Sequence, residues 1–249
     1  EHVKNSFFEN HAFHNEDGTP LTAAGSEIVQ KFYNITGIQE RRYLSADLQS
    51  SDMAAIASEQ AIADAGIDRE SIDQIIVAHN FGDTKAGSVV PELMPTMAAK
   101  VKNKLNIQNP ACVAYDIIFG CPGWVQAMIQ ADVYLKSGYA KNCLVIGTES
   151  LSRMVDPSDR DAMIFADGAG AVLLTGETIN DPVGIINQSS VTHASKELNY
   201  LTMGPSYQHP EEKDLYIKMK GRNIYNYALV EVPKAIKQCL DKSNLTLDD

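Results

Sequence analysis

Residues 112–149 read CVAYDIIFGCPGWVQAMIQADVYLKSGYAKNCLVIGTE, and this stretch decides the fold. The runs at its two ends are short, apolar and rich in β-branched residues, which is typical of buried strands. The run between them has the length of a helix, and Gly138 provides a stop at its end. The stretch therefore predicts a strand, a helix over about 121–137 and a second strand.

The same alternation continues on both sides. A helix is predicted over 51–66, followed by the strand IDQIIVAHN and a helix around 91–105 opened by Pro91. Further on, AMIFADGAGAVLLTGE predicts two strands joined or bent at small residues. Alternating strands and helices predict an α/β fold with a mostly parallel sheet and helices on its faces. Further predicted elements are a short helix near 21–34, a strand in 184–195, a polar loop over 195–213, an extended run at 215–221 and a helix over 222–243.

The chain contains an internal repeat. The segment VPKAIKQCLDKSNLTLDD at 232–249 resembles IASEQAIADAGIDRESID at 56–73. The strand QIIVAHN follows the first copy, whereas the second copy reaches residue 249. Such a repeat predicts two similar α/β halves, the second of them incomplete. We place the boundary in ETINDPVG, which gives a first half over 1–176 and the start of a second half over 177–249.

Composition and charge exclude several classes of function. The formal net charge of −11 repels a phosphate backbone, which argues against a nucleic-acid partner. The apolar runs are too short to span a bilayer, so we expect no membrane association and a cytoplasmic location. The four cysteines show neither a CxxC pair nor a zinc-type histidine spacing, so no metal site is predicted.

Cys121 lies in FGCPGW at 119–124, where the first strand of the opening stretch turns into its helix. Gly120 and Gly123 leave room for a close approach, and Pro122 suits the first position of a helix. The start of a helix also favours a thiolate. These features predict a nucleophile, and the alternative is that Cys121 packs as a small apolar residue.

Two other motifs receive less weight. His79 ends a predicted strand and is the histidine with an obvious route to the sheet edge, but the sequence does not place it near Cys121. FADGAGAVLL at 165–174 lacks the third glycine of a dinucleotide-binding loop and continues as a strand, so we predict no such cofactor.

Residues 115–174 as a whole resemble the core of the β-ketoacyl-acyl-carrier-protein synthase III family of thiolase-fold condensing enzymes. Weaker similarity extends to TGIQERRY at 36–43, DQIIVAHN at 73–80 and IKMKGRNIYNYAL at 217–229. The resemblance implies a five-layered αβαβα fold of two similar halves, with the first nearly complete here and the second truncated. It also implies a homodimer.

The resemblance further implies an acyltransferase of fatty acid biosynthesis. Cys121 matches the family nucleophile, which takes an acyl group from a coenzyme A or acyl carrier protein thioester. Malonyl carrier protein then condenses with the acyl-cysteine in a decarboxylative Claisen reaction, and no cofactor is required. Two alternatives remain open: a related condensing enzyme of secondary metabolism or hydroxymethylglutaryl-type synthesis, and a non-catalytic dimer partner of an active synthase.

The family resemblance also assigns substrate-binding positions. Arg160 matches an arginine that helps to hold the coenzyme A nucleotide, and Lys220 and Arg222 suit a phosphate or an acidic carrier protein. Positions implied at the acyl and pantetheine channel are Thr36, Phe165, Met219, Gly221 and Tyr225.

This chain departs from the family pattern in several places. Pro122 and Trp124 replace a small residue and a phenylalanine, and Lys31 stands where many members have a tryptophan that stacks on adenine. The family's catalytic histidine and asparagine follow the point where this chain ends. We therefore expect the 249-residue chain alone to be inactive in condensation.

Overall fold

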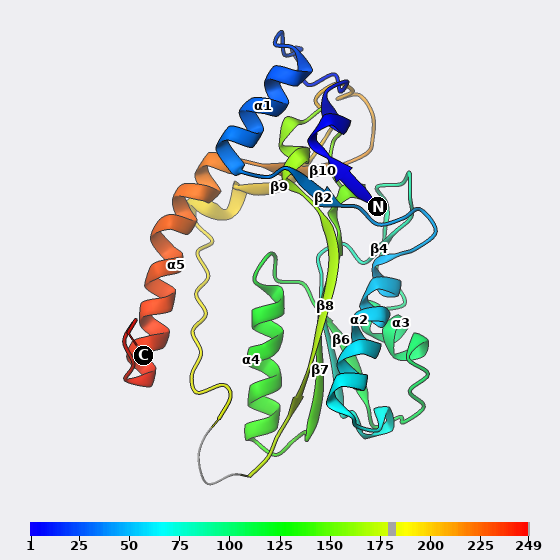
Figure 1. Ribbon diagram of the computed structural model, residues 1–249, viewed down its shortest axis with the longest axis vertical. Coiled ribbons are helices and arrows are strands. Elements are labelled where there is room, and N and C mark those ends of the chain that lie inside the picture. Colours follow the sequence, from blue (N-terminus) through cyan, green and yellow to red (C-terminus); the bar gives the residue numbers. More distant parts are fainter. Residues whose placement is uncertain (179–182, 249) are drawn as a thin grey trace.

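The computed structural model describes residues 1–178 and 183–248 (Figure 1). Its centre is a four-stranded sheet with the strand order β6-β3-β7-β8. The strands β3, β6 and β7 are parallel, and β8 is antiparallel to β7. The predicted mostly parallel sheet is thus confirmed. The strands span Gln74–Ala78 (β3), Val113–Ile117 (β6), Asn142–Ser150 (β7) and Asp167–Thr175 (β8).

Helices cover both faces of this sheet, because both faces of its central strands are apolar. Leu144 and Ile146 of β7 pack with residues of α2 and α3, whereas Cys143 and Val145, which alternate with them, pack with α4. Figure 1 shows this three-layer arrangement, with β7 and β8 between α4 and α2. The helices span Gly25–Thr36 (α1), Ser50–Ala65 (α2), Met97–Lys104 (α3), Gly123–Lys136 (α4) and Gly221–Ser243 (α5).

Short ladders and turns complete the description. Three antiparallel pairs are β1 with β2, β4 with β5, and β9 with β10. Their strands span His2–Lys4 (β1), Glu40–Arg42 (β2), Asp83–Thr84 (β4), Pro91–Glu92 (β5), Leu201–Gly204 (β9) and Tyr216–Met219 (β10). Single turns of 3-10 helix span Asn5–Phe8, Arg69–Ser71, Leu151–Arg153, Arg160–Ile164 and Lys196–Asn199.

Three predicted elements were wrong in extent. The helix predicted around 91–105 begins only at Met97, because Pro91 pairs with Thr84 in a short ladder and Thr96 caps the helix. The stretch predicted as two strands is the single strand β8, which pairs with β7 without interruption after a 3-10 turn. The helix after Cys121 begins two residues later than predicted, and Pro122 is its N-cap residue.

Two predictions in the last third of the chain were also wrong. The region 184–195, predicted as a strand, is irregular in the structure. The region predicted as a polar loop contains β9, which pairs with β10. The predicted boundary at 177–184 lies largely on residues 179–182, outside the described residues, so the division into two halves stays a prediction.

The helix α5 stands apart from the sheet. The extended segment at 185–190 lies between α4 and α5 (Figure 1): Lys136 of α4 donates to the Ile185 carbonyl, and Lys242 of α5 donates to that of Gln188. None of the side chains of α5 is buried. In the described chain, none of the helices is long and apolar enough to cross a bilayer.

Candidate active site

The C-terminal ends of three parallel strands meet at one edge of the sheet. Ala78 of β3 pairs with Ile117 of β6 on one side and with Gly147 of β7 on the other. The residues that follow Ala78, Ile117 and Gly147 therefore lie side by side at this edge of the sheet. This edge carries Asn80, Glu149 and the turn that contains Cys121.

The Cys121 turn is shaped by its glycines. Gly120 has a φ of +75°, which only glycine adopts without strain, and its carbonyl accepts from the Gly123 N–H. A Cβ atom on Gly123 would lie 3.2 Å from the Cβ of Ala78, so glycine lets the start of α4 approach β3. Cys121 itself is exposed and free. Among the described residues, its backbone N–H has no hydrogen-bond partner.

Asn80 and Glu149 support this turn from the neighbouring strands. The side-chain oxygen of Asn80 accepts from the Gly120 N–H at 3.1 Å. The backbone and side-chain N–H groups of Asn80 donate to Oε2 of Glu149 at 2.7 and 3.0 Å. Sequence reasoning missed both residues, because 40 and 69 positions separate the partners.

His79 is buried beside the turn but has no free nitrogen. Its Nδ1 accepts from the Gly82 N–H at 3.0 Å, so the ring proton resides on Nε2, which faces Asp116 Oδ2 at 2.9 Å. Burial of Asp116 opposes its ionisation, but hydrogen bonds from His79, Ala98 and Met97 outweigh this effect and lower the pKa of Asp116. The His79–Asp116 pair therefore ties β3 to β6 and leaves no base for Cys121.

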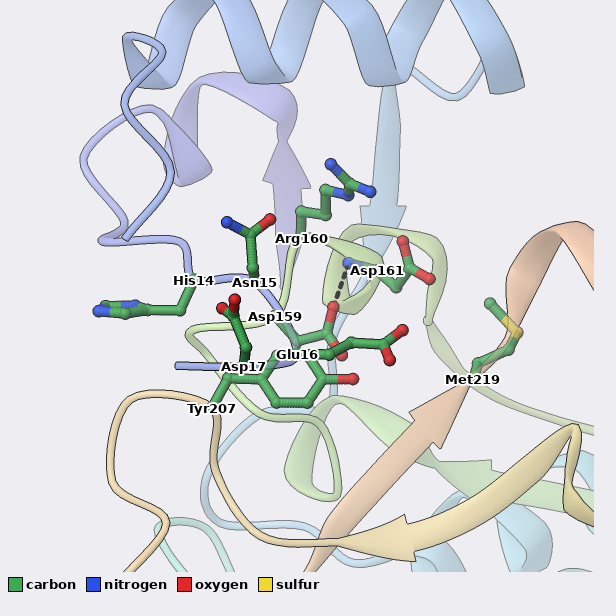
Figure 2. Close-up of a pocket in the computed structure, with 9 residues that line it drawn as sticks. All are labelled: His14, Asn15, Glu16, Asp17, Asp159, Arg160, Asp161, Tyr207 and Met219. Atoms are coloured by element: carbon green, nitrogen blue, oxygen red, sulfur yellow. Dashed lines mark hydrogen bonds between the residues drawn. The ribbon is translucent and has the colours of Figure 1, made fainter. Parts of the chain in front are cut away.

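A cavity of about 460 Å³ contains two of the predicted binding residues (Figure 2). Arg160 and Met219 line it, and a Cβ atom on Gly221 would lie 3.5 Å from Oδ2 of Asp161 at its edge. Arg160 is exposed, and its side chain points away from Glu16 and Asp17 (Figure 2). The remaining lining residues are His14, Asn15, Glu16, Asp17, Asp159, Asp161 and Tyr207.

The cavity is acidic, which the sequence analysis did not predict. Four carboxyl groups and one guanidinium group line it, and burial raises the pKa of Asp159 to about 6. Burial also raises the pKa of Asp161. The signals were present in NEDG at 15–18 and in DPSDRD at 156–161, but nothing local indicates that these two loops meet.

The other predicted residues lie outside this cavity. Thr36 is exposed at the end of α1, where its hydroxyl donates to the Phe32 carbonyl. Phe165 is half-buried just before β8, and Tyr225 is exposed on α5. Cys121 is likewise absent from the residues that line the cavity in the described chain. The structure thus brings Arg160, Met219 and Gly221 together.

A smaller apolar groove of about 330 Å³ lies beside the first turn of α4. Trp124 forms one wall, and Gly147, Gly170, Ala171 and Val172 of β7 and β8 form the other. A Cβ atom on Gly147 would lie 3.3 Å from Trp124, so the indole packs directly on the β7 backbone. Trp124 therefore occupies space that a side chain at position 147 of β7 would fill.

One cluster in the described chain has the spacing of possible metal ligands. His209, Glu211 and Glu212 lie close together in a loop, but all three are exposed. Exposed acidic groups commonly gather without an ion. We assign no metal to it.

Comparison with known proteins finds similarity to one family. The 3-oxoacyl-[acyl-carrier-protein] synthase III family model matches residues 115–193. β-Ketoacyl-acyl-carrier-protein synthase III 1 of Vibrio parahaemolyticus is 37% identical over 211 residues, which are 84% of this chain and 62% of the relative. The chain is thus similar to synthase III proteins over most of its length. The synthase III of Staphylococcus saprophyticus is 36% identical over 86% of this chain and 63% of its own length. The chain thus spans less than two thirds of these curated relatives.

Solved structures of synthase III proteins confirm the predicted thiolase-like fold. The 3-oxoacyl-[acyl-carrier-protein] synthase III of Aquifex aeolicus matches with a TM-score of 0.76 and 28% identity, over 99% of this chain and 69% of that chain. The synthase III of Thermus thermophilus matches with a TM-score of 0.75 and 27% identity, over 100% and 70%. Within this fold, the described residues supply one four-stranded sheet, the helices on both of its faces, three two-stranded ladders, α1 and α5.

Proposed function

We propose that the protein is a β-ketoacyl-acyl-carrier-protein synthase III-like acyltransferase of fatty acid synthesis with Cys121 as its nucleophile. The observation that carries this proposal is the exposed thiol in a glycine-bounded turn between a strand and a helix start. A helix start favours a thiolate and offers backbone N–H groups to a developing oxyanion. The unpaired N–H of Cys121 suits that role.

The chemistry proceeds in two steps, a thioester exchange and then a condensation in which a C–C bond forms and the Sγ–C bond breaks. The Cys121 thiolate attacks the acyl carbonyl of the donor, an Sγ–C bond forms, and the donor's C–S bond breaks to release its thiolate. In the second step the malonyl carrier loses CO₂, and its carbanion attacks the acyl-cysteine and returns the Cys121 thiolate. The catalytic histidine and asparagine of the family would assist this second step from beyond residue 249.

The negative charge of the acidic cavity affects which acyl donor the protein can bind. If Arg160 holds the same position as its family counterpart, a coenzyme A nucleotide would meet Glu16, Asp17, Asp159 and Asp161 there. Its phosphates carry like charge, which costs binding energy. An acyl group carried on phosphopantetheine, without the nucleotide, brings a single phosphodiester charge and so meets less of this repulsion. We therefore propose an acyl carrier protein as the preferred donor.

The test is acylation of the full-length protein by acyl carrier protein and by coenzyme A thioesters of one acyl group, followed by intact mass. We expect one acyl adduct, faster from the carrier protein and absent in C121S. An adduct that survives in C121S would refute the nucleophile. Equal rates from both donors would refute the donor preference. Primer profiling separates fatty acid synthesis from a related condensation.

A non-catalytic dimer partner remains the second candidate. β6 is an edge strand of the sheet, and its first residue Val113 and the next residue after it, Ile118, are 46% and 63% exposed. An open, apolar edge suits pairing with a second copy or with an active synthase. We propose a cytoplasmic homodimer, which sedimentation of the pure protein tests. A monomer at all concentrations would contradict it.

A further inference from the structure

We propose that Glu149 is a positioning residue for Cys121 and acts through Asn80. This inference rests on the proposed role of Cys121 as the nucleophile. It adds two residues, Asn80 and Glu149, that are distant from Cys121 in the sequence and would help to orient it.

Glu149 lies on the same face of the sheet as the nucleophile helix. Side chains alternate along β7, and Gly147 lies under Trp124 of α4. Glu149, two residues further on, therefore faces the α4 side at the C-terminal end of the strand. Its partner on β8 is Gly168, which has no side chain to cover the carboxyl group.

The hydrogen bonds fix the orientation of the Asn80 amide. Oε2 of Glu149 accepts from both N–H donors of Asn80, so the NH₂ group must face Glu149. The amide oxygen is thereby left to accept from the Gly120 N–H. If the amide turned over, two donors would face each other at Gly120 and two acceptors at Glu149.

The hydrogen bond to the Gly120 N–H links Glu149 and Asn80 to the orientation of the Cys121 thiol. Gly120 directly precedes Cys121 and has the left-handed φ of +75°. Rotation about this residue swings the whole turn, and with it Sγ and the N–H of Cys121. The bond to Asn80 resists that rotation, so the thiol and the neighbouring N–H keep one orientation toward a bound acyl group.

The buried carboxyl group of Glu149 is only partly satisfied by hydrogen bonds, which argues for a role beyond stabilising the fold. In the described chain its Oε1 is buried and has no hydrogen-bond partner. Burial also raises the pKa of Glu149, an effect that outweighs the hydrogen bonds from Asn80, the nearby His79 and the backbone of Ser150. A neutral side chain would satisfy the fold at lower cost, since an unpaired buried polar atom is destabilising.

The test reverses the polarity of the contact in the full-length protein. N80D keeps an acceptor for Gly120 but sets a carboxylate against Glu149, whereas the double variant N80D/E149Q restores a donor opposite an acceptor. The readouts are the rate of Cys121 alkylation by iodoacetamide across neutral pH, the rate of acyl transfer, and thermal unfolding. C121S supplies the background from the other cysteines, and E27A is the matched control at an exposed glutamate.

We expect N80D to alkylate and acylate about tenfold more slowly than the wild type, with recovery in N80D/E149Q. If N80D does not fold, E149A and E149Q take its place: E149A should slow about tenfold, and E149Q should recover most of that loss. Wild-type rates in variants that lose only thermal stability would overturn the inference. So would a double variant as slow as N80D.

Failure of the proposed function gives a different result. A wild-type protein that alkylates but never acylates would refute the proposed synthase activity. The alkylation rates of the variants would still decide whether Glu149 and Asn80 orient the thiol.

Discussion

Asp159 is a buried carboxyl group at the wall of the acidic cavity, and its ionisation opposes folding. Burial raises its pKa to about 6, from 3.8 in the unfolded chain. A raised folded-state pKa contributes stability that is fully present below about pH 3.8 and is lost as pH rises through about 6. At neutral pH the folded protein therefore holds an unfavourable charge.

We predict that D159N becomes more stable relative to the wild type as the pH rises. Asparagine stays neutral and keeps the oxygen that accepts from the Asp161 N–H. The difference in unfolding free energy should grow by up to about 3 kcal/mol between about pH 3 and about pH 8. Urea unfolding at several pH values measures it, and parallel stability curves for the two proteins would contradict it.

Sequence reasoning succeeds for residues whose surroundings are local. The Cys121 turn is predictable because Gly120, Pro122 and Gly123 are its neighbours in the chain. The Asn80–Glu149 contact and the acidic cavity were not predictable, because each joins loops that only the assembled sheet brings together. Asparagine and glutamate have no local pattern that marks such a role.

At the scale of elements, Asp116 joins three of them. From the end of β6 it accepts from the N–H groups of Met97 and Ala98, the first residues of α3, at 2.8 and 2.7 Å. It also faces His79 after β3. A carboxylate at a helix start satisfies donors that the helix leaves unpaired. Asp116 therefore fixes α3 and β3 against β6.

We predict that D116N loses about 2 kcal/mol of unfolding free energy at neutral pH. The pKa of Asp116 is lowered in the folded state, so its stabilisation is present above about pH 3.8 and is lost as pH falls through the folded value. The difference between D116N and the wild type should therefore shrink in acid. Urea unfolding measures it, and an unchanged difference across this range would assign the loss to packing.

The same elements show why helix and strand limits were partly wrong. Pro91 resembles a helix start, but it pairs with Thr84, which is a contact between different parts of the chain. The small residues of β8 suggest a bend, yet nine consecutive pairs with β7 keep it continuous. The type of an element, helix or strand, was predictable where its own sequence has an apolar pattern. The residues at which it begins and ends depend on the segments with which it pairs.

At the scale of the whole molecule, the repeat relates α2 to α5, but the two helices have different surroundings. α2 buries Ala54, Ser58 and Ile62 against the sheet. In α5 the apolar residues remain exposed, namely Leu229, Val230, Val232 and Ile236. The helix is held by the segment at 185–190 through polar contacts such as Asn187 with Lys242 and Ser189 with Gln238. Exposed polar contacts of this kind add little stability.

This difference predicts uneven hydrogen exchange in the 249-residue chain. Amides of α5 should exchange about a hundredfold or more faster than those of β3, all of whose residues are buried, because α5 can open without disturbing the sheet. Exchange measured by mass spectrometry at several protein concentrations tests this. Equal protection at low concentration would show that α5 is anchored more firmly than its contacts indicate. Protection that appears only at high concentration would mean that a second copy covers its apolar face.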